Sequence, residues 1–416
     1  MNHVWYRPDG SWRRFGRVVI AGSPLRLFRL GPAGVAVAER IERGDEVTQS
    51  RLIDRLLDAG AIHPIASDPP SSRFGAGDVA VVTPQLRIDA STAVLDDGRI
   101  TVDDGSRPPL DGATVRLDVN QGPAAARNAA RPLVDTPLVA FVDADVVVPR
   151  GWLDRLVGHF DDPGVALVAP RVDGEPGSPL DLGDEPARIR AGTRVSYVPG
   201  AAMVVRTAAF DAVGGFDPTL RFGEDVDFVW RLDEAGWRCR YEPASRVWHQ
   251  PRSGVTARLR QHAGYGSSAA PLALRHPSSL SPVQFNGWTA FVWSAAVAGH
   301  PLVAVTAMIG SSLALARRLP DVPPRAAVGL AVRGHLAAGR QLATAVRRAW
   351  WPVVAVGAFV SRRMRWVAVV SVLADVGATP TDVAYGWGVW RGMWRHRTWA
   401  PVVPRLSAWP GKPRPT

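Results

Sequence analysis

Two aspartates, Asp143 and Asp145, directly follow five apolar residues, Leu138–Val142. A short apolar run of this kind is typical of an interior strand of a parallel sheet, and open α/β sheets bind ligands at the carboxyl ends of their strands. Two carboxylates in that position suit a divalent cation that carries a diphosphate. An isolated Asp-x-Asp sequence also fits an ordinary Asx turn, so the metal site depends on the other motifs of the chain.

Further polar motifs lie on both sides of this strand. In chain order they are the carboxylates Asp103 and Asp104, the helix start Gly122-Pro-Ala-Ala-Ala-Arg127-Asn128, the turn Gly214-Gly-Phe-Asp217, the helix start Gly223-Glu224-Asp225 and the strand that ends in His249. The ordered set resembles the family 2 glycosyltransferases, which have the GT-A fold and use nucleotide sugars. The resemblance covers roughly residues 78–252. It is specific as a set, although each motif alone is weak.

The resemblance implies a nucleotide-binding role for the first motifs. Asp104, with Asp103 beside it, would accept a hydrogen bond from the uracil imide. Gly122 opens a helix that lines the nucleotide pocket, so Arg127 would face the diphosphate. The alternative for Arg127 is a solvated arginine on a helix surface.

Glu224 and Asp225 stand where a helix over residues 226–235 is predicted to begin. Carboxylates at a helix start ordinarily cap it. In the order of motifs described above, we instead expect Asp225 to be a general base kept ionised by the helix dipole, with Glu224 orienting the acceptor or the base. The same resemblance implies that His249 reaches the metal or the diphosphate, and a structural histidine is the alternative.

The chain has 416 residues, which is too long for one ordinary domain. Its single cysteine, Cys239, excludes an internal disulfide, suits a reducing compartment and fits an inert core position. The polar and aromatic start of the chain has no apolar centre, so we expect no signal peptide and a catalytic part that stays in the cytoplasm.

The net charge of +11 is unevenly distributed. Residues 276–416 contain 16 basic and 3 acidic residues, whereas residues 1–275 contain 33 basic and 35 acidic residues. A nearly neutral body argues against nucleic acid as its partner, and a basic tail favours contact with an anionic surface.

Residues 1–74 are expected to form a small opening module. A strand over Val18–Ala21 and helices over Pro32–Arg43 and 48–59 suit a winged-helix-like fold, and residues 67–72 suit a linker. The segment resembles the small peptide-binding domains of the PqqD type. A structural cap on the enzyme domain is the alternative.

Residues 78–275 are expected to form the α/β catalytic domain. The predicted elements are strands over 78–83, 100–102 and 165–169, a helix over 151–160 and a mobile loop over 172–193. Only residues 84–99 remain for the crossover between the first two strands, which is short for a parallel connection. This half of the nucleotide site is therefore trimmed relative to similar proteins.

Residues 276–416 are expected to form a basic, helical, membrane-associated tail that holds 10 of the 16 tryptophans. The run 288–316 has no formally charged residue, so it is long enough for one span or for a kinked re-entrant hairpin. Arg333, Arg340 and Arg347 recur every seven residues, which suggests a helix lying in the membrane interface. A soluble core is the alternative.

The full layout resembles the mycofactocin-system glycosyltransferases. The matching segments are 21–34, 192–199 and 265–272. This resemblance implies sequential transfer of glucose from UDP-glucose onto a peptide-derived redox cofactor precursor. The carboxylates themselves suggest an inverting transfer that uses Mg²⁺ or Mn²⁺. The polar start of the chain and its basic tail predict a catalytic domain on the cytoplasmic side of the cell membrane. Two departures are the short 84–99 segment and the shortened approach to residues 180–183, where relatives carry an aromatic residue and arginines.

Two other functions fit the same sequence. A membrane-attached glycosyltransferase that acts on a polyprenyl phosphate or a cell-wall glycan would use the same catalytic residues. A non-catalytic scaffold that binds peptide through the opening module would explain the trimmed donor site.

Overall fold

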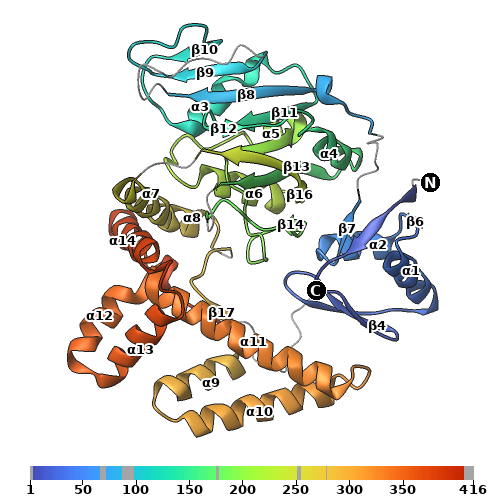
Figure 1. Ribbon diagram of the computed structural model, residues 1–416, viewed down its shortest axis with the longest axis vertical. Helices are drawn as coiled ribbons and strands as arrows, with labels where there is room; N and C mark the ends of the chain where they lie inside the picture. The colour runs from blue at the N-terminus through green and yellow to red at the C-terminus, as the bar shows by residue number, and fades with distance from the viewer. Residues whose placement is uncertain are drawn as a thin grey trace. The chain divides into compact units, whose positions relative to one another are not determined.

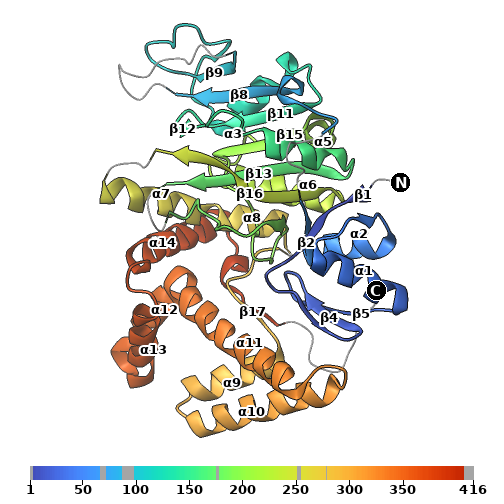
Figure 2. The ribbon, with the colours of Figure 1, turned by 45° about the vertical axis from the view of Figure 1, so that its right-hand side comes forward.

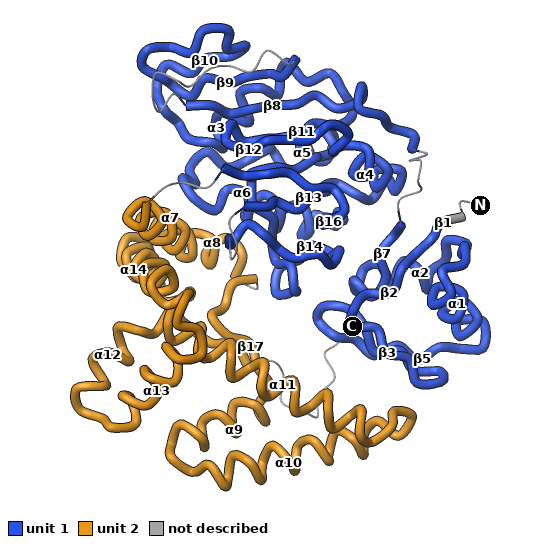
Figure 3. Tube along the Cα trace, viewed as in Figure 1, with its two compact units in different colours: residues 1–251 blue, residues 252–416 orange. Residues whose placement is uncertain are grey.

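The computed structural model describes residues 3–65, 72–86, 98–174, 178–250, 254–277 and 279–406. The chain divides into two compact units, residues 1–251 and 252–416 (Figure 3), and each is described by itself. The expected linker at 67–72 and the crossover at 84–99 lie mostly outside the described residues. The expected division into domains at 74 and 275 stays a prediction.

Unit 1 begins with a small module of short strands and two helices. Its elements are β1 (His3–Val4), β2 (Tyr6–Pro8), β3 (Arg13–Phe15), β4 (Val18–Ala21), β5 (Arg26–Arg29), α1 (Pro32–Arg43), β6 (Val47–Thr48), α2 (Arg51–Asp58) and β7 (Ile62–Pro64). The predicted first strand and first helix are confirmed. The second helix begins at Arg51 rather than at residue 48, because Val47 and Thr48 pair with β1 and Ser50 caps the helix. The PqqD-like resemblance stays a prediction.

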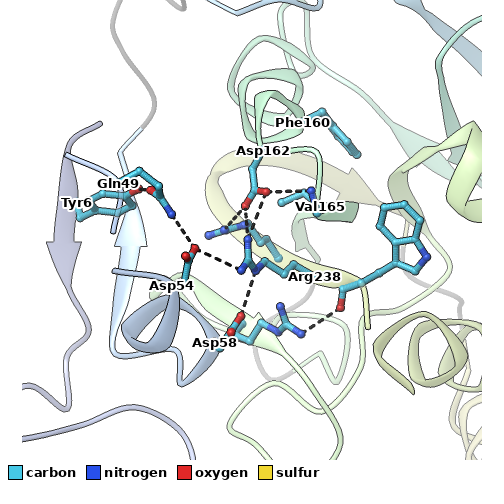
Figure 4. Close-up of polar contacts among 12 residues, drawn as sticks. Tyr6, Gln49, Asp54, Asp58, Phe160, Asp162, Val165 and Arg238 are labelled. Carbon is cyan, nitrogen blue, oxygen red and sulfur yellow. Dashed lines mark hydrogen bonds and ion pairs between the residues drawn. The ribbon is translucent and has the colours of Figure 1, made fainter. Parts of the chain in front are cut away.

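Arg238 joins the module to the rest of unit 1 (Figure 4). Its Nε lies 3.0 Å from Asp58 and its Nη2 lies 3.5 Å from Asp54, both on α2. Its Nη1 lies 3.0 Å from Asp162. Burial alone would raise the pKa of Asp162, but Arg240 and Arg238 hold that pKa below its ordinary value. The module is thus attached through a network of charges.

A second attachment reaches the segment that leads to the strand β15 (Ala202–Arg206). The backbone N–H of Arg194 donates to Oγ of Ser23 at 2.7 Å, and its guanidinium lies 3.1 Å from Asp9. Asp9 is also bonded to the buried His63 at 3.0 Å.

The remainder of unit 1 is built on one mixed sheet. Its strands are β8 (Val79–Gln85), β9 (Ile100–Asp104), β10 (Val115–Leu117), β11 (Leu138–Val142), β12 (Val146–Val147), β13 (Val165–Asp173), β14 (Ala187–Ile189), β15 (Ala202–Arg206) and β16 (Arg238–His249). The order is β10-β9-β8-β11-β15-β13-β16-β12, with β14 paired to β16 (Figure 1). The first four are parallel, and β15 runs antiparallel to β11 and β13. The predicted α/β class is confirmed.

Helices cover this sheet (Figure 2). They are α3 (Pro123–Ala129), α4 (Asp154–Val157), α5 (Thr207–Ala212) and α6 (Glu224–Glu234), with 3₁₀ turns η1 (Ala76–Asp78), η2 (Arg131–Leu133) and η3 (Gly158–Asp161). The helix predicted over 151–160 is thus only partly right. Leu138 packs with Leu156 on one face of β11, and Phe141 contacts Phe210 and Phe216 on the other. Burial on both faces explains the unbroken apolar run of this strand.

The described part of the 172–193 segment is hydrogen-bonded to the sheet. Asp181 accepts two bonds of 2.8 Å from Arg171, the hydroxyl of Tyr241 donates to the carbonyl of Gly183 at 2.6 Å, and β14 pairs with β16. These contacts hold the segment more firmly than the prediction of a mobile loop implies.

Unit 2 is helical. Its elements are α7 (Val255–Ser267), α8 (Ala269–Arg275), β17 (Gln284–Phe285), α9 (Gly287–Val297), α10 (Pro301–Arg318), α11 (Pro324–Ala345), the π-helical turn η4 (Val346–Trp350), α12 (Trp351–Val360), α13 (Arg362–Leu373), α14 (Thr379–His396), η5 (Ala400–Val402) and β18 (Arg405–Leu406). Helices α7 and α14 cross at glycines: a Cβ on Gly388 would lie 2.0 Å from the carbonyl oxygen of Ala263. Small residues here therefore allow close backbone packing.

The expected membrane features of the tail differ from the structure in two respects. Among the described residues, we find no helix with both the length and the apolar character needed to cross a bilayer, and the run 288–316 is divided between α9 and α10. Arg347 does not share an exposed face with Arg333 and Arg340, because it is buried and its Nε lies 2.8 Å from the buried Asp382. The arginine repeat therefore does not mark one interfacial face.

Candidate active site

Asp143 and Asp145 directly follow the strand β11 and lie at its carboxyl end. All five of its residues are buried, and Asp143 follows with its backbone N–H donating to the carbonyl of Ala201 at 2.9 Å. The side chains of Asp143 and Asp145 are 32% and 35% exposed. The predicted interior strand is confirmed, and both carboxylates remain accessible to a ligand.

Arg127 connects this strand end to the start of α6. Its Nη2 donates to Asp143 at 2.7 Å and to the carbonyl of Gly200 at 3.1 Å, while its Nη1 donates to Glu224 at 3.0 Å. The guanidinium also lies over the ring of Phe216, 5.2 Å from its centroid. Arg127 is 2% exposed, so the solvated alternative is wrong. The arginine lies behind the carboxylates, and contact with a diphosphate stays a prediction.

Gly200 connects Arg127 with Asp225, because its carbonyl accepts from the guanidinium and its N–H donates to the carboxylate. Its N–H donates to Oδ2 of Asp225 at 2.9 Å, while the N–H of Val226 donates to the other oxygen at 2.8 Å. A Cβ on Gly200 would lie 2.8 Å from Nη2 of Arg127, so a side chain would displace the guanidinium. Asp143, Glu224 and Asp225 therefore belong to one cluster.

The start of α6 does not lower the pKa values of its first two carboxylates. Burial and the negative charge of Asp225 raise the pKa of Glu224 to about 7, against the opposing effect of Arg127. Burial likewise raises the pKa of Asp225, although the N–H groups of Gly200 and Val226 oppose the shift. Burial therefore acts against the expected ionisation of Asp225 at the helix start, and the role of Asp225 as a base stays a prediction. A raised pKa makes a carboxylate a stronger base once it is ionised.

We expect a pH dependence that follows from these shifts. Below a pH of about 7 the Glu224–Asp225 pair holds a proton, so kcat/KM for transfer should fall as the pH drops through that value. In Glu224→Gln the remaining carboxylate loses the like charge of Glu224, so the acidic limb of the profile should move to lower pH. An unchanged limb in this variant would contradict the assignment of the limb to the pair.

Asp103 and Asp104 are both buried at the end of β9. Asp104 accepts hydrogen bonds from the N–H groups of Gln121 at 2.8 Å and Gly122 at 2.9 Å. Burial would raise the pKa of Asp103, but its bonds from Ser106 and the nearby Arg116 hold that pKa below its ordinary value. Both carboxylates thus fix the loop that leads into α3, and the contact of Asp104 with uracil stays a prediction.

His249 and Asp145 form the part of the site best suited to a divalent cation. Nε2 of His249 lies 3.3 Å from Oδ2 of Asp145, and β12 pairs with β16 so that Val146 faces His249. Within the described residues, no group of three or more His, Cys, Asp or Glu side chains forms a complete metal site. Mg²⁺ commonly binds one or two carboxylates together with substrate phosphates, so this donor set fits such an ion.

Asn128 is a structural residue of the site that the sequence did not assign. Its Nδ2 donates to the carbonyl of Phe216 at 2.7 Å, and its Oδ1 accepts from the N–H of Phe216 at 2.9 Å. A Cβ on Gly215, whose φ is +70°, would lie 2.7 Å from the same Oδ1. Two adjacent residues of α3 thus hold different parts of the site. Arg127 holds the carboxylates of Asp143 and Glu224, and Asn128 holds the turn at Gly215 and Phe216. The position of Asn128 directly after Arg127 was the feature of the sequence that could have indicated this role.

One family of domains matches part of this chain, and one known protein matches nearly all of it. Residues 106–264 match the family described as glycosyltransferase like family 2. The pre-mycofactocin glycosyltransferase of Mycobacterium tuberculosis (strain ATCC 25618 / H37Rv) is 38% identical over 94% of this chain and 95% of that protein. The chain belongs to the family 2 glycosyltransferases.

Two other proteins match part of this glycosyltransferase. The succinoglycan biosynthesis protein ExoA of Rhizobium meliloti (strain 1021) is 30% identical over 33% of this chain and 44% of that protein. The N-acetylglucosaminyl-diphospho-decaprenol L-rhamnosyltransferase of Mycobacterium tuberculosis is 31% identical over 30% of this chain and 38% of that protein. The chain is therefore an enzyme and not a non-catalytic scaffold.

Proposed function

We propose that this glycosyltransferase moves glucose from UDP-glucose onto a peptide-derived redox cofactor precursor, with inversion at the sugar. The observation that carries the proposal is the match, over nearly the whole of both chains, to the pre-mycofactocin glycosyltransferase. The carboxylate cluster around Arg127 supports it, because a single displacement needs one base and one means of stabilising the departing diphosphate.

In the proposed reaction, Asp225 removes the proton of the acceptor hydroxyl as the hydroxyl attacks the sugar. The N–H groups of Gly200 and Val226 hold this carboxylate in place. Glu224 lies beside Asp225 and raises the affinity of the pair for that proton. Arg127 fixes Glu224 and Asp143 relative to each other, so the base and the leaving-group side are positioned by one guanidinium.

We propose that Asp143, Asp145 and His249 hold Mg²⁺ or Mn²⁺. When bound, such an ion supplies positive charge to the diphosphate leaving group. Chelation should abolish transfer and Mn²⁺ should restore it. His249→Ala should raise the Mn²⁺ concentration needed for half-maximal activity at least about tenfold, since even outer metal partners contribute that much. Transfer that persists after full chelation would reject the metal site, and the exposed His300→Ala is the matched control.

The function is tested by mass spectrometry of acceptors incubated with purified full-length protein, UDP-glucose and Mn²⁺. The proposal expects hexose addition to the peptide-derived precursor. A second candidate is transfer to a polyprenyl phosphate, favoured by the partial match to the decaprenol rhamnosyltransferase. Hexose addition to the polyprenyl phosphate alone would support that candidate and overturn the first.

A further inference from the structure

Helices α12 and α13 of unit 2 form a hairpin with a very short turn (Figure 1). Ser361 ends α12 and caps α13, with its Oγ accepting from the N–H of Met364 at 3.4 Å. The two helices pack closely, since a Cβ on Gly357 would lie 3.0 Å from Cγ of Met364. The sequence therefore produces a compact helical pair.

One side of the hairpin is fixed to the rest of unit 2. Val354 and Ser371 are buried, and the buried Arg347 donates from Nη1 to the carbonyl of Ser371 at 2.6 Å. Arg347 is itself paired with Asp382 on α14. The orientation of the hairpin within unit 2 is thus set by a buried ion pair.

The other side exposes apolar side chains at helical spacing. Phe359 and Val360, at the turn, are 87% and 88% exposed. The large exposed apolar residues of the hairpin are Val353, Val356, Phe359 and Val360 on α12, and Trp366, Val369, Val370, Val372 and Leu373 on α13. Of those on α13, Trp366, Val369, Val370 and Leu373 are spaced i, i+3, i+4 and i+7, which gives one continuous stripe. Each such side chain left in water forfeits the favourable free energy of its burial.

Arginines lie beside this apolar surface. Arg362, Arg363 and Arg365 occupy the first turn of α13, next to Phe359 and Val360, and all three are exposed. Residues 351–373 contain no acidic residue. An apolar stripe with a basic edge is typical of helices that lie in the plane of an anionic membrane surface, where tryptophan also accumulates.

We propose that the α12–α13 hairpin docks this enzyme on an anionic phospholipid surface, with Phe359 and Val360 inserted below the headgroups. The arginines of α13 contact the lipid phosphates. A second copy of the chain is disfavoured as the occupant, because the same arginines on two hairpins would repel each other. The proposal does not depend on the identity of the acceptor. Within the tail of residues 276–416, for which the sequence predicts membrane association, it assigns the contact to α12 and α13.

Vesicle flotation of the full-length protein tests the proposal. We expect the protein to float with vesicles of phosphatidylcholine and phosphatidylglycerol, but much less with phosphatidylcholine alone, and to be released by salt. The double variant Phe359→Ser/Val360→Ser should lower partitioning about tenfold or more. Arg362→Glu should remove the preference for the anionic vesicles. All these side chains are exposed, so glycosyl transfer in solution should be retained.

Two control variants separate this hairpin from other exposed apolar residues. Leu133→Ser changes an exposed leucine of unit 1, and Leu302→Ser changes an exposed leucine of α10. Both should bind anionic vesicles as the wild type does. The proposal is overturned if the wild type does not float, if the double variant floats equally well, or if only Leu302→Ser loses binding. A concentration-dependent dimer that the double variant loses, without vesicle binding, would assign the surface to a second copy instead.

Discussion

Asp225→Asn is expected to reduce glycosyl transfer by about 10²–10⁴-fold, the usual contribution of a general base. The asparagine oxygen can still accept the N–H of Gly200, which is bonded to Oδ2 of Asp225 at 2.9 Å, so the segment behind the site should keep its position. What is lost is the ability to accept the acceptor proton. Nucleotide-sugar affinity, measured by titration calorimetry, should remain within a few-fold of the wild type.

The stability of this variant provides an independent check. The pKa of Asp225 is raised in the folded protein, so its ionised form costs stability at pH values above that pKa. A neutral amide removes that cost but leaves the N–H of Val226 without its acceptor, so the melting temperature at pH 8 should stay close to that of the wild type. Asp211→Asn, which changes a carboxylate paired with Arg131 on the same unit, should leave transfer unchanged. Turnover of Asp225→Asn close to the wild-type rate would remove Asp225 from the role of base.

The sequence was sufficient to predict the elements that carry the site. A strand buried on both faces has a continuous apolar run, so the position of β11 and of the two aspartates after it could be read directly. The starts of α3 and α6 could also be predicted from local sequence. Gly122 and Pro123 open α3, and Gly223 precedes α6, because these residues adopt the backbone angles that a helix start needs. The order of these motifs then predicted the α/β fold.

The electrostatic arrangement could not be predicted in the same way. Arg127 lies on a short, alanine-rich helix whose pattern does not distinguish an inward from an outward face, so its burial depends on tertiary packing. The raised pKa values of Glu224 and Asp225 likewise depend on burial, which a position at a helix start does not reveal. The burial of Arg347 in unit 2 could not be predicted either. Its spacing from Arg333 and Arg340 suggested a shared exposed face, whereas Asp382, which is distant in the sequence, pairs with it in the interior.

Arg127→Met is expected to have the largest combined effect on stability and activity. The variant leaves the carboxylates of Asp143 and Glu224 and the carbonyl of Gly200 without their shared donor. Removing one member of a buried ion network typically costs about 3–5 kcal/mol, because the remaining charge stays buried and unpaired. Denaturant unfolding should show this loss, and transfer should fall to a small residual rate that can still be measured.

Arg127→Lys separates positioning from stability. The ammonium keeps the positive charge, so the free energy of unfolding should fall less than in Arg127→Met. One compact ammonium cannot reproduce the planar fork that reaches Glu224 from Nη1 and Asp143 from Nη2. Transfer should therefore remain strongly reduced in a variant that is folded, which a purely structural role would not produce.

The pH profile of the arginine variants distinguishes the two roles further. The positive charge of Arg127 opposes the upward shift in the pKa of Glu224, so its loss in Arg127→Met should move the acidic limb of residual activity above the wild-type value of about 7. Arg131→Met is the matched control, because Arg131 is paired with the exposed Asp211 and its loss should cost only about 0–1 kcal/mol. If Arg127→Met and Arg131→Met lost similar stability and kept the same acidic limb, Arg127 would not organise the carboxylates of this site.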